Sequence, residues 1–96
     1  MAKTIVIQIG NSDNKLTQSD WAQFIAMTRD VVAANVRCIH FQGGSDWDAP
    51  WQNACWVCEE MPETSFMDRL LRKLTECRKT FRQDSVAITV GQTEFI

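Results

Sequence analysis

The chain has 96 residues, the length of one domain, and we expect residues 1–96 to form a single unit. Apolar residues make up 45% of it and charged residues 23%, a balance that excludes a disordered chain. The formal net charge is −2, whereas binding a nucleic-acid polymer usually requires a basic face, so we expect no nucleic-acid polymer as a partner.

The first predicted element is a strand over residues 4–9. Its side chains are mostly β-branched, and Ile5, Ile7 and Ile9 fall on one face because successive side chains of a strand alternate. Residues 10–14 then have the composition of a turn.

A helix follows that turn. Thr17 with Asp20 three residues later is a capping pair, in which Asp replaces the more usual Glu or Gln. The helix has an amphipathic pattern and is predicted to end near residue 35. Its apolar stripe consists of Trp21, Phe24, Ile25, Thr28, Val31 and Val32.

Two further strands are predicted over residues 36–42 and 53–59, joined by residues 43–52. In the third strand, alternation places Trp56 on the face opposite to Cys55. Because these strands are neighbours along the chain, we expect them to form a hairpin.

The last elements are a second helix and a fourth strand. Pro62 ends the third strand, and Ser65 with Asp68 is a second capping pair. The fourth strand spans residues 85–90. The apolar positions of the second helix are Phe66, Leu70, Leu74, Cys77 and Phe81.

The order β-α-β-β-α-β predicts an α+β, ferredoxin-like sandwich, with both helices on one face of an antiparallel sheet of strand order 4-1-3-2. The other face should be mixed in character, which suits a ligand or a partner subunit better than a dry core. Its expected residues are Thr4, Val6, Gln8, Ser85, Ala87 and Thr89.

The segment 43–52 is the main candidate for a working surface. It is longer than a hairpin needs, and it contains Trp47, Trp51, Asp46 and Asp48. Tryptophan offers a large rigid stacking face and is enriched at binding sites. The alternative is a loop folded back over the sheet with its own aromatic side chains. We expect ligand contacts from Asp46, Trp47, Trp51, Gln52 and Asn53, with Trp56 on the adjoining strand joining them.

His40 is the only histidine in the chain, and it is a candidate catalytic residue. Oriented by Asp46 or Asp48, it would serve as an acid–base pair near neutral pH. The alternative is a structural histidine held by hydrogen bonds at a strand end.

The four cysteines, at positions 38, 55, 58 and 77, are expected to be reduced thiols. Cys55 and Cys58 form a C-x-x-C pattern, and Cys38 with His40 adds two more candidate zinc ligands. Residues three apart on a strand point to opposite faces, so Cys55 and Cys58 cannot share one metal. We therefore expect no metal and no cofactor.

The turn after the first strand is a second candidate for ligand contact. Its backbone amides, together with Asn11, Asp13 and Lys15, would hold an anion at the start of the helix. An ordinary Asx-rich turn is the alternative.

Several segments resemble short uncharacterised bacterial and phage proteins. They are residues 10–13 (GNSD), 16–18 (LTQ), 50–56 (PWQNACW), 83–87 (QDSVA) and 93–96 (TEFI). This resemblance implies a small stand-alone protein and brings no activity and no catalytic residue with it.

The distribution of apolar residues along the chain predicts the cellular location of the protein and its self-association. We expect a cytoplasmic protein without a membrane segment, since no apolar run approaches the ~20 residues that a span requires. Phe95 and Ile96 are large apolar residues that should be buried against the protein's own sheet or a neighbouring copy. A homodimer or higher homo-oligomer is therefore expected.

Three interpretations of function remain open. The first is a non-catalytic module that binds a small planar or anionic, nucleotide-like ligand or a protein partner through residues 43–52. The second is a small enzyme that uses His40 with Asp46 or Asp48. The third is a structural protein that interacts through its open sheet face.

Overall fold

The described part of the computed structural model comprises residues 3–46 and 48–96. It contains four strands and two long helices in the order β-α-β-β-α-β, with a short 3-10 turn after the first strand. The elements are β1 (Lys3–Gly10), η1 (Ser12–Asn14), α1 (Gln18–Asn35), β2 (Cys38–Gly44), β3 (Asn53–Glu59), α2 (Phe66–Thr80) and β4 (Ala87–Gln92).

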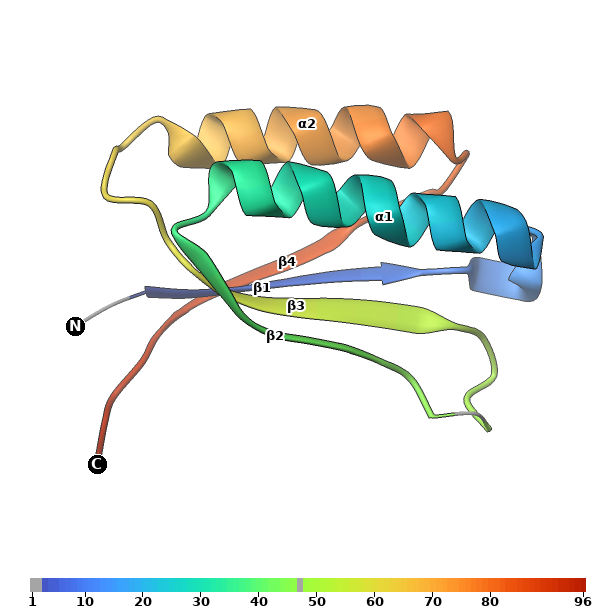
Figure 1. Ribbon diagram of the computed structural model, residues 1–96, viewed down its shortest axis with the longest axis horizontal. Helices are drawn as coiled ribbons and strands as arrows, with labels where there is room; N and C mark the ends of the chain where they lie inside the picture. Colours follow the sequence, from blue (N-terminus) through green and yellow to red (C-terminus); the bar gives the residue numbers. More distant parts are fainter. Residues whose placement is uncertain (1–2, 47) are drawn as a thin grey trace.

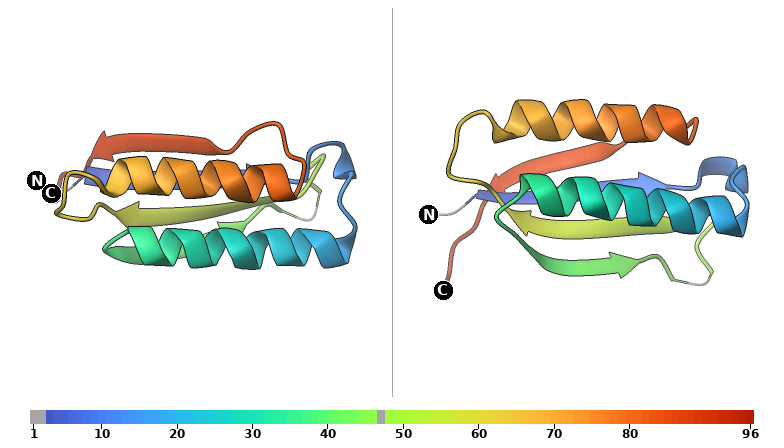
Figure 2. Two further views of the ribbon diagram at one scale, coloured as in Figure 1. Left: turned by 90° about the horizontal axis from the view of Figure 1, so that it is seen from above. Right: turned by 45° about the horizontal axis from the view of Figure 1, so that its top comes forward.

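The strands form one antiparallel sheet in the order β2-β3-β1-β4, and both helices cover the same face of it (Figure 1). The two helices lie side by side, as Figure 2 shows from above. This is the ferredoxin-like arrangement predicted from the order of the elements, with β1 and β3 in the centre and β2 and β4 at the edges.

The core lies between the helices and the inward face of β1 and β3. Ile7 is paired with Trp56 across these strands, and both side chains are fully buried. Trp56 therefore belongs to the core, which corrects the expectation that it joins the loop tryptophans. Its indole N–H is buried without a hydrogen-bond partner among the described residues. Truncation of a buried tryptophan to alanine costs about 3–5 kcal/mol of stability.

The beginnings of the two helices differ from each other. Thr17 caps α1 as predicted, because its Oγ1 accepts a hydrogen bond from the Asp20 N–H at 3.1 Å. The cap predicted at Ser65 is not formed. Instead, the Ser65 side chain is within 3.1 Å of the Arg69 guanidinium, which also forms an ion pair with Glu63.

The edge strands depart from the predicted boundaries. β2 begins at Cys38 instead of residue 36, and its register with β3 shifts between Ile39 and Phe41. His40 occupies this bulge and lies near the beginning of β2, not near its end as predicted. β4 begins at Ala87, so Ser85 precedes the sheet.

The face of the sheet opposite the helices is open, as predicted from alternation. The pairing aligns Phe41, Val57, Val6 and Thr89 in a transverse row that crosses all four strands. Phe41 is 59% exposed, and its ring lies over Gly43, where a Cβ atom would come within 2.8 Å of it. We call these four residues the open-face row.

The remaining expectations concern the membrane and the last residues. Among residues 3–46 and 48–96, neither helix combines the length and the apolar character needed to span a bilayer. Phe95 and Ile96 are exposed, so the expected burial against the protein's own sheet is not formed.

The four thiols differ in exposure. Cys38 and Cys55 are half-buried on the open face, whereas Cys58 and Cys77 lie in the core. Burial raises the pKa of the Cys58 thiol to about 11, with a smaller contribution from the neighbouring cysteines. Burial also raises the pKa of Cys77, although a hydrogen bond with Thr28 opposes the effect. Both core thiols therefore remain protonated at neutral pH.

We predict that only Cys38 and Cys55 react rapidly with a thiol reagent in the native protein. Cys58 and Cys77 should react only at the rate at which the protein unfolds. Raising the pH from about 7 to about 9 should not make Cys58 reactive in the folded protein, because this pH stays below the raised pKa of its thiol. Timed alkylation with mass spectrometry measures this. The double variant Cys38→Ser/Cys55→Ser should show no fast phase, and four equal rates in the native wild type would contradict the assignment.

Candidate functional site

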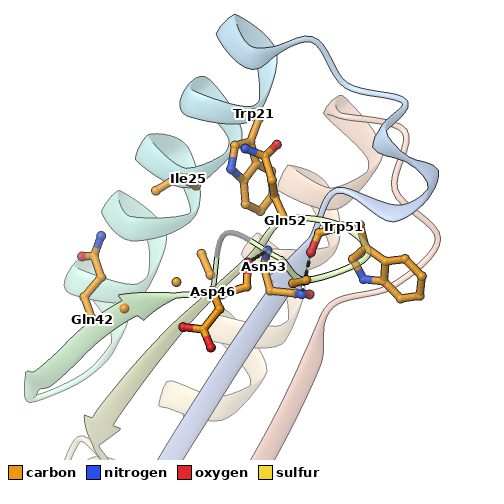
Figure 3. A pocket seen from close by; sticks show the side chains of 12 residues that line it. Trp21, Ile25, Gln42, Asp46, Trp51, Gln52 and Asn53 are labelled. Carbon is orange, nitrogen blue, oxygen red and sulfur yellow. Dashed lines mark hydrogen bonds between the residues drawn. The ribbon is translucent and has the colours of Figure 1, made fainter.

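A hollow lies between α1 and the tip of the β2–β3 hairpin. Its volume is about 480 Å³. Trp21 and Ile25 of α1 form one wall, and the end of β2, the connecting loop and the start of β3 form the rest (Figure 3). The lining residues are Trp21, Ile25, Gln42, Gly43, Gly44, Ser45, Asp46, Ala49, Trp51, Gln52, Asn53 and Ala54. We call this hollow the hairpin pocket.

The hairpin pocket includes several of the predicted ligand-binding residues. Asp46, Trp51, Gln52 and Asn53 all line it, whereas Trp47 lies outside the described residues. The indole of Trp51 is directed away from Trp21 (Figure 3) and is 42% exposed. Trp51 also lines a smaller hollow of about 170 Å³ on the other side of the loop.

Trp21 was missed as a site residue. Its apolar stripe position predicts a core residue, and it is indeed only 6% exposed. What remains exposed faces the hairpin pocket, because the pocket forms where the beginning of α1 passes the hairpin tip. The local pattern cannot reveal this, since it depends on the packing of two distant segments.

Gln52 connects the hairpin to the turn and to the first helix. Its side chain exchanges two hydrogen bonds with Gln18, at 2.8 and 3.0 Å, and its Oε1 accepts a third from Asn11 Nδ2 at 3.2 Å. Its backbone carbonyl accepts from the Asn11 N–H at 2.8 Å. These bonds position the loop against α1 and thereby shape the hairpin pocket.

Asn11 has a structural role in the same network. It is fully buried, and its side chain closes the turn by bonding both the N–H and the carbonyl of Leu16, at 2.9 and 3.2 Å. A ligand cannot use an amide whose donor and acceptor are both engaged in this way. Asn11 was predicted to contact a ligand, and its side-chain contacts are instead made within the protein.

The turn over residues 10–15 is not arranged as an anion site. The N–H groups of Asn11, Asn14 and Lys15 all donate to backbone carbonyls within the protein. Asp13 and Asn14 adopt left-handed backbone conformations, with φ of 57° and 51°, which short polar residues tolerate. Lys15 lines a separate hollow with Leu16, Phe81 and Arg82. The Asx-rich turn is thus the better description.

His40 does not meet either of its predicted acidic partners. It lies near the beginning of β2, and Asp46 follows the end of that strand, so the stretch from His40 to the end of β2 alone spans roughly 13 Å at about 3.3 Å per residue. Asp48 comes later still in the connecting loop. The expected acid–base pair of His40 with Asp46 or Asp48 is therefore corrected.

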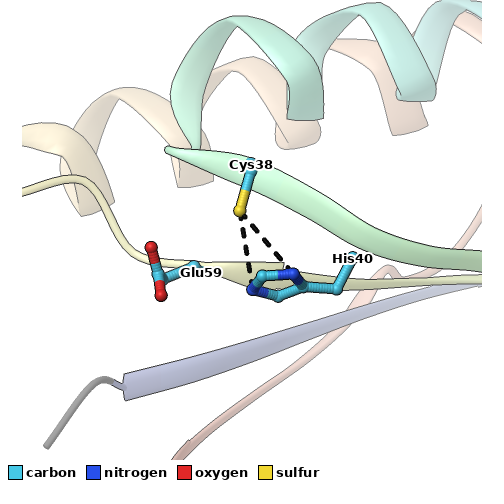
Figure 4. A group of neighbouring side chains, drawn as sticks. All are labelled: Cys38, His40 and Glu59. Atoms are coloured by element: carbon cyan, nitrogen blue, oxygen red, sulfur yellow. Dashed lines mark hydrogen bonds between the residues drawn. The ribbon is translucent and has the colours of Figure 1, made fainter.

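The imidazole of His40 instead lies beside Cys38 and Glu59 (Figure 4). Cys38 Sγ is 3.5 Å from Nε2 and 3.8 Å from Nδ1 of the ring. One ligand atom from each of the three residues lies within 4.8 Å of the others. Glu59 was missed, because only the register of the hairpin places it opposite Cys38.

The Asn11 network gives a prediction about stability. Asn11→Ala should lower the free energy of unfolding by about 1–3 kcal/mol, because it leaves the buried backbone groups of Leu16 without partners. Gln18→Ala removes two exposed hydrogen bonds and should change it by no more than about 0.5 kcal/mol. Urea denaturation of both variants measures this, and equal losses would contradict the structural role of Asn11.

No protein-family model and no curated protein matches the sequence. Among solved structures, a dimeric ferredoxin-like protein of unknown function from Thermobifida fusca YX is similar, with a TM-score of 0.64 and 9% identity over 96% of this chain and 92% of that one. The de novo designed protein Foldit4 has a TM-score of 0.59 and 12% identity, covering 97% of each chain. The protein At3g17210 from Arabidopsis thaliana has a TM-score of 0.56 and 8% identity, covering 100% of this chain and 98% of that one. At these identities the likeness shows a common ferredoxin-like fold.

Proposed function

We propose that the protein is a non-catalytic binding module whose small-molecule ligand occupies the hairpin pocket. The observation that carries this proposal is the size and lining of that pocket. Its volume of about 480 Å³ falls within the roughly 300–1,000 Å³ typical of ligand sites. Trp21 and several amide side chains line it, a combination suited to a planar molecule with hydrogen-bonding edges.

The charge of the lining narrows the class of ligand. Asp46 is the only charged residue among those that line the pocket, and no lysine or arginine is among them. A carboxylate disfavours an anionic ligand and favours a neutral or cationic one. Of the planar or anionic ligands expected from the sequence, the planar, uncharged kind fits better, as a nucleobase or a nucleoside would.

The position of His40 supports binding over acid–base catalysis. The pocket lies at the end of β2, whereas His40 lies near its beginning and contacts Cys38. A general base must come within hydrogen-bond reach of the proton that it removes. The one imidazole of the chain is therefore too distant to act on a molecule in the hairpin pocket.

We predict that adenosine binds in the hairpin pocket more tightly than AMP does. The purine can stack and form hydrogen bonds there, whereas the phosphate of AMP is repelled by Asp46. In a titration followed by amide and indole NMR signals, adenosine should shift residues 43–46 and the indole of Trp21. Ile25→Phe, which fills the pocket, should weaken binding by at least about tenfold.

Two controls accompany this titration. Leu71→Phe adds the same kind of bulk on α2, away from the pocket, and should leave the affinity unchanged. The indole of Trp56 is buried in the core, so its signal should not move. An unchanged pocket at millimolar adenosine, or tighter binding of AMP, would contradict the proposed ligand class.

A second candidate function, self-association, is favoured by the open-face row. Phe41, Val57 and Val6 form a continuous apolar line across three strands. It lies on the face of the sheet that the helices leave uncovered (Figure 1). The similar protein from Thermobifida fusca is dimeric, which supports the same behaviour for this fold. A twofold axis through the open face would pair the row with its own copy, in the symmetry most common among oligomers.

We predict that the wild-type protein at tens of micromolar sediments at twice its chain mass of 11.0 kDa. Phe41→Glu should give a folded monomer, because it places charges on both sides of the contact. Met27→Glu, at an exposed apolar position on α1, should remain a dimer. A monomeric wild type would contradict the proposal, and a dimer lost only on deletion of residues 94–96 would place the contact at Phe95 and Ile96 instead.

A further inference from the structure

We propose that Cys38, His40 and Glu59 bind a divalent transition-metal ion of the zinc class. These residues lie at the end of the sheet where β2 begins and β3 ends, far along the strands from the hairpin pocket (Figure 4). The site does not depend on the ligand proposed above. It also differs from the C-x-x-C pattern, because Cys55 and Cys58 lie on opposite faces of β3.

The β-bulge in β2 creates this group of side chains. The pairs Gly44↔Ala54 and Phe41↔Val57 define a register that, if continued, would place Ile39 opposite Glu59. The bulge shifts the register by one residue, so Cys38 becomes the partner of Glu59 and His40 is left as the extra residue. Bulges are frequent beside functional sites, because they redirect a side chain.

The distances fit a tetrahedral ion. With Zn–S of about 2.3 Å and Zn–N or Zn–O of about 2.0–2.2 Å, tetrahedral ligand atoms are about 3.4–3.6 Å apart. Cys38 Sγ is 3.5 Å from His40 Nε2 and 3.8 Å from Nδ1, so the sulfur lies over the ring, and the imidazole must turn before one of its nitrogen lone pairs faces a shared ion. All three ligand atoms lie within 4.8 Å of one another, so closing around an ion requires side-chain movements on the order of 1 Å together with rotation of the exposed imidazole.

The chemistry of the ligands selects the class of ion. A thiolate and an imidazole favour zinc and similar transition metals, whereas magnesium and calcium favour sites made of oxygen. Arg37 Nε is 3.2 Å from Glu59 Oε2 and orients the carboxylate, as outer groups commonly do around a metal. Cys38 and Glu59 are half-buried and His40 is exposed, so water can occupy the fourth position.

Titration with Co²⁺ and Zn²⁺ alone tests this site. The protein should bind one ion per chain, and Co²⁺ should produce a thiolate-to-metal charge-transfer band that Zn²⁺ removes. Cys38→Ser should abolish the band. His40→Ala and Glu59→Gln should each weaken binding by more than the roughly 10- to 100-fold that loss of an outer-shell partner causes.

Matched control variants distinguish the removal of a metal-coordinating side chain from a general disruption of the folded protein. Cys55→Ser changes a half-buried thiol of the same face and should leave the band and the affinity unchanged. Arg37→Gln removes the ion pair with Glu59 but no proposed ligand, so one bound ion and the charge-transfer band should persist. Zinc should also protect Cys38 from alkylation while Cys55 stays reactive, which gives a readout within a single wild-type sample.

Any one of four results would overturn the proposal. These are the absence of a stoichiometric bound ion, a Co²⁺ spectrum without the thiolate band, equal protection of Cys38 and Cys55 from alkylation by zinc, and an unchanged metal affinity in Cys38→Ser. Circular dichroism verifies the folding of each variant. If Cys38→Ser does not fold, His40→Ala decides instead, because it changes an exposed side chain and should still lose the ion.

Discussion

The two-residue period of the central strands is the constraint on which the rest of the molecule depends. In β1, it directs Ile5, Ile7 and Ile9 towards the helices, where each is almost fully buried. The paired positions on β3 follow the same alternation, so Trp56 enters the core between strand and helix. Every residue between them must then lie on the open face, because a strand has only two faces.

That alternation explains why the open face has its particular character. Val6 and Val57 are directly paired, and Phe41 continues the line onto the edge strand. Thr4, Gln8 and Thr89 lie on the same face, so it is mixed in character. The same period separates the protonated core thiol of Cys58 from the accessible thiol of Cys55.

A second constraint comes from the amide network around Gln52. One side chain connects the hairpin to Gln18 at the beginning of α1 and to the buried Asn11 of the turn. The hairpin pocket therefore has walls from segments that are far apart in sequence but bonded to each other. The hairpin pocket and the Cys38, His40 and Glu59 group occupy opposite ends of β2.

The local sequence pattern was sufficient to predict the helices and strands, their order and the inward face of β1. These features depend on side-chain periodicity and turn composition, which are set within a few residues. It also singled out the segment 43–52, whose length and composition are unusual for a hairpin loop, but it did not reveal that Asn11 is buried. It misplaced Trp56 and His40, and it did not find Trp21 or Glu59 as site residues. Which face of β3 meets the helices, and which residue lies opposite Cys38, depend on strand pairing between distant segments. A bulge of one residue changes that pairing without any signal in the local pattern, so only the packed sheet brings Cys38, His40 and Glu59 together.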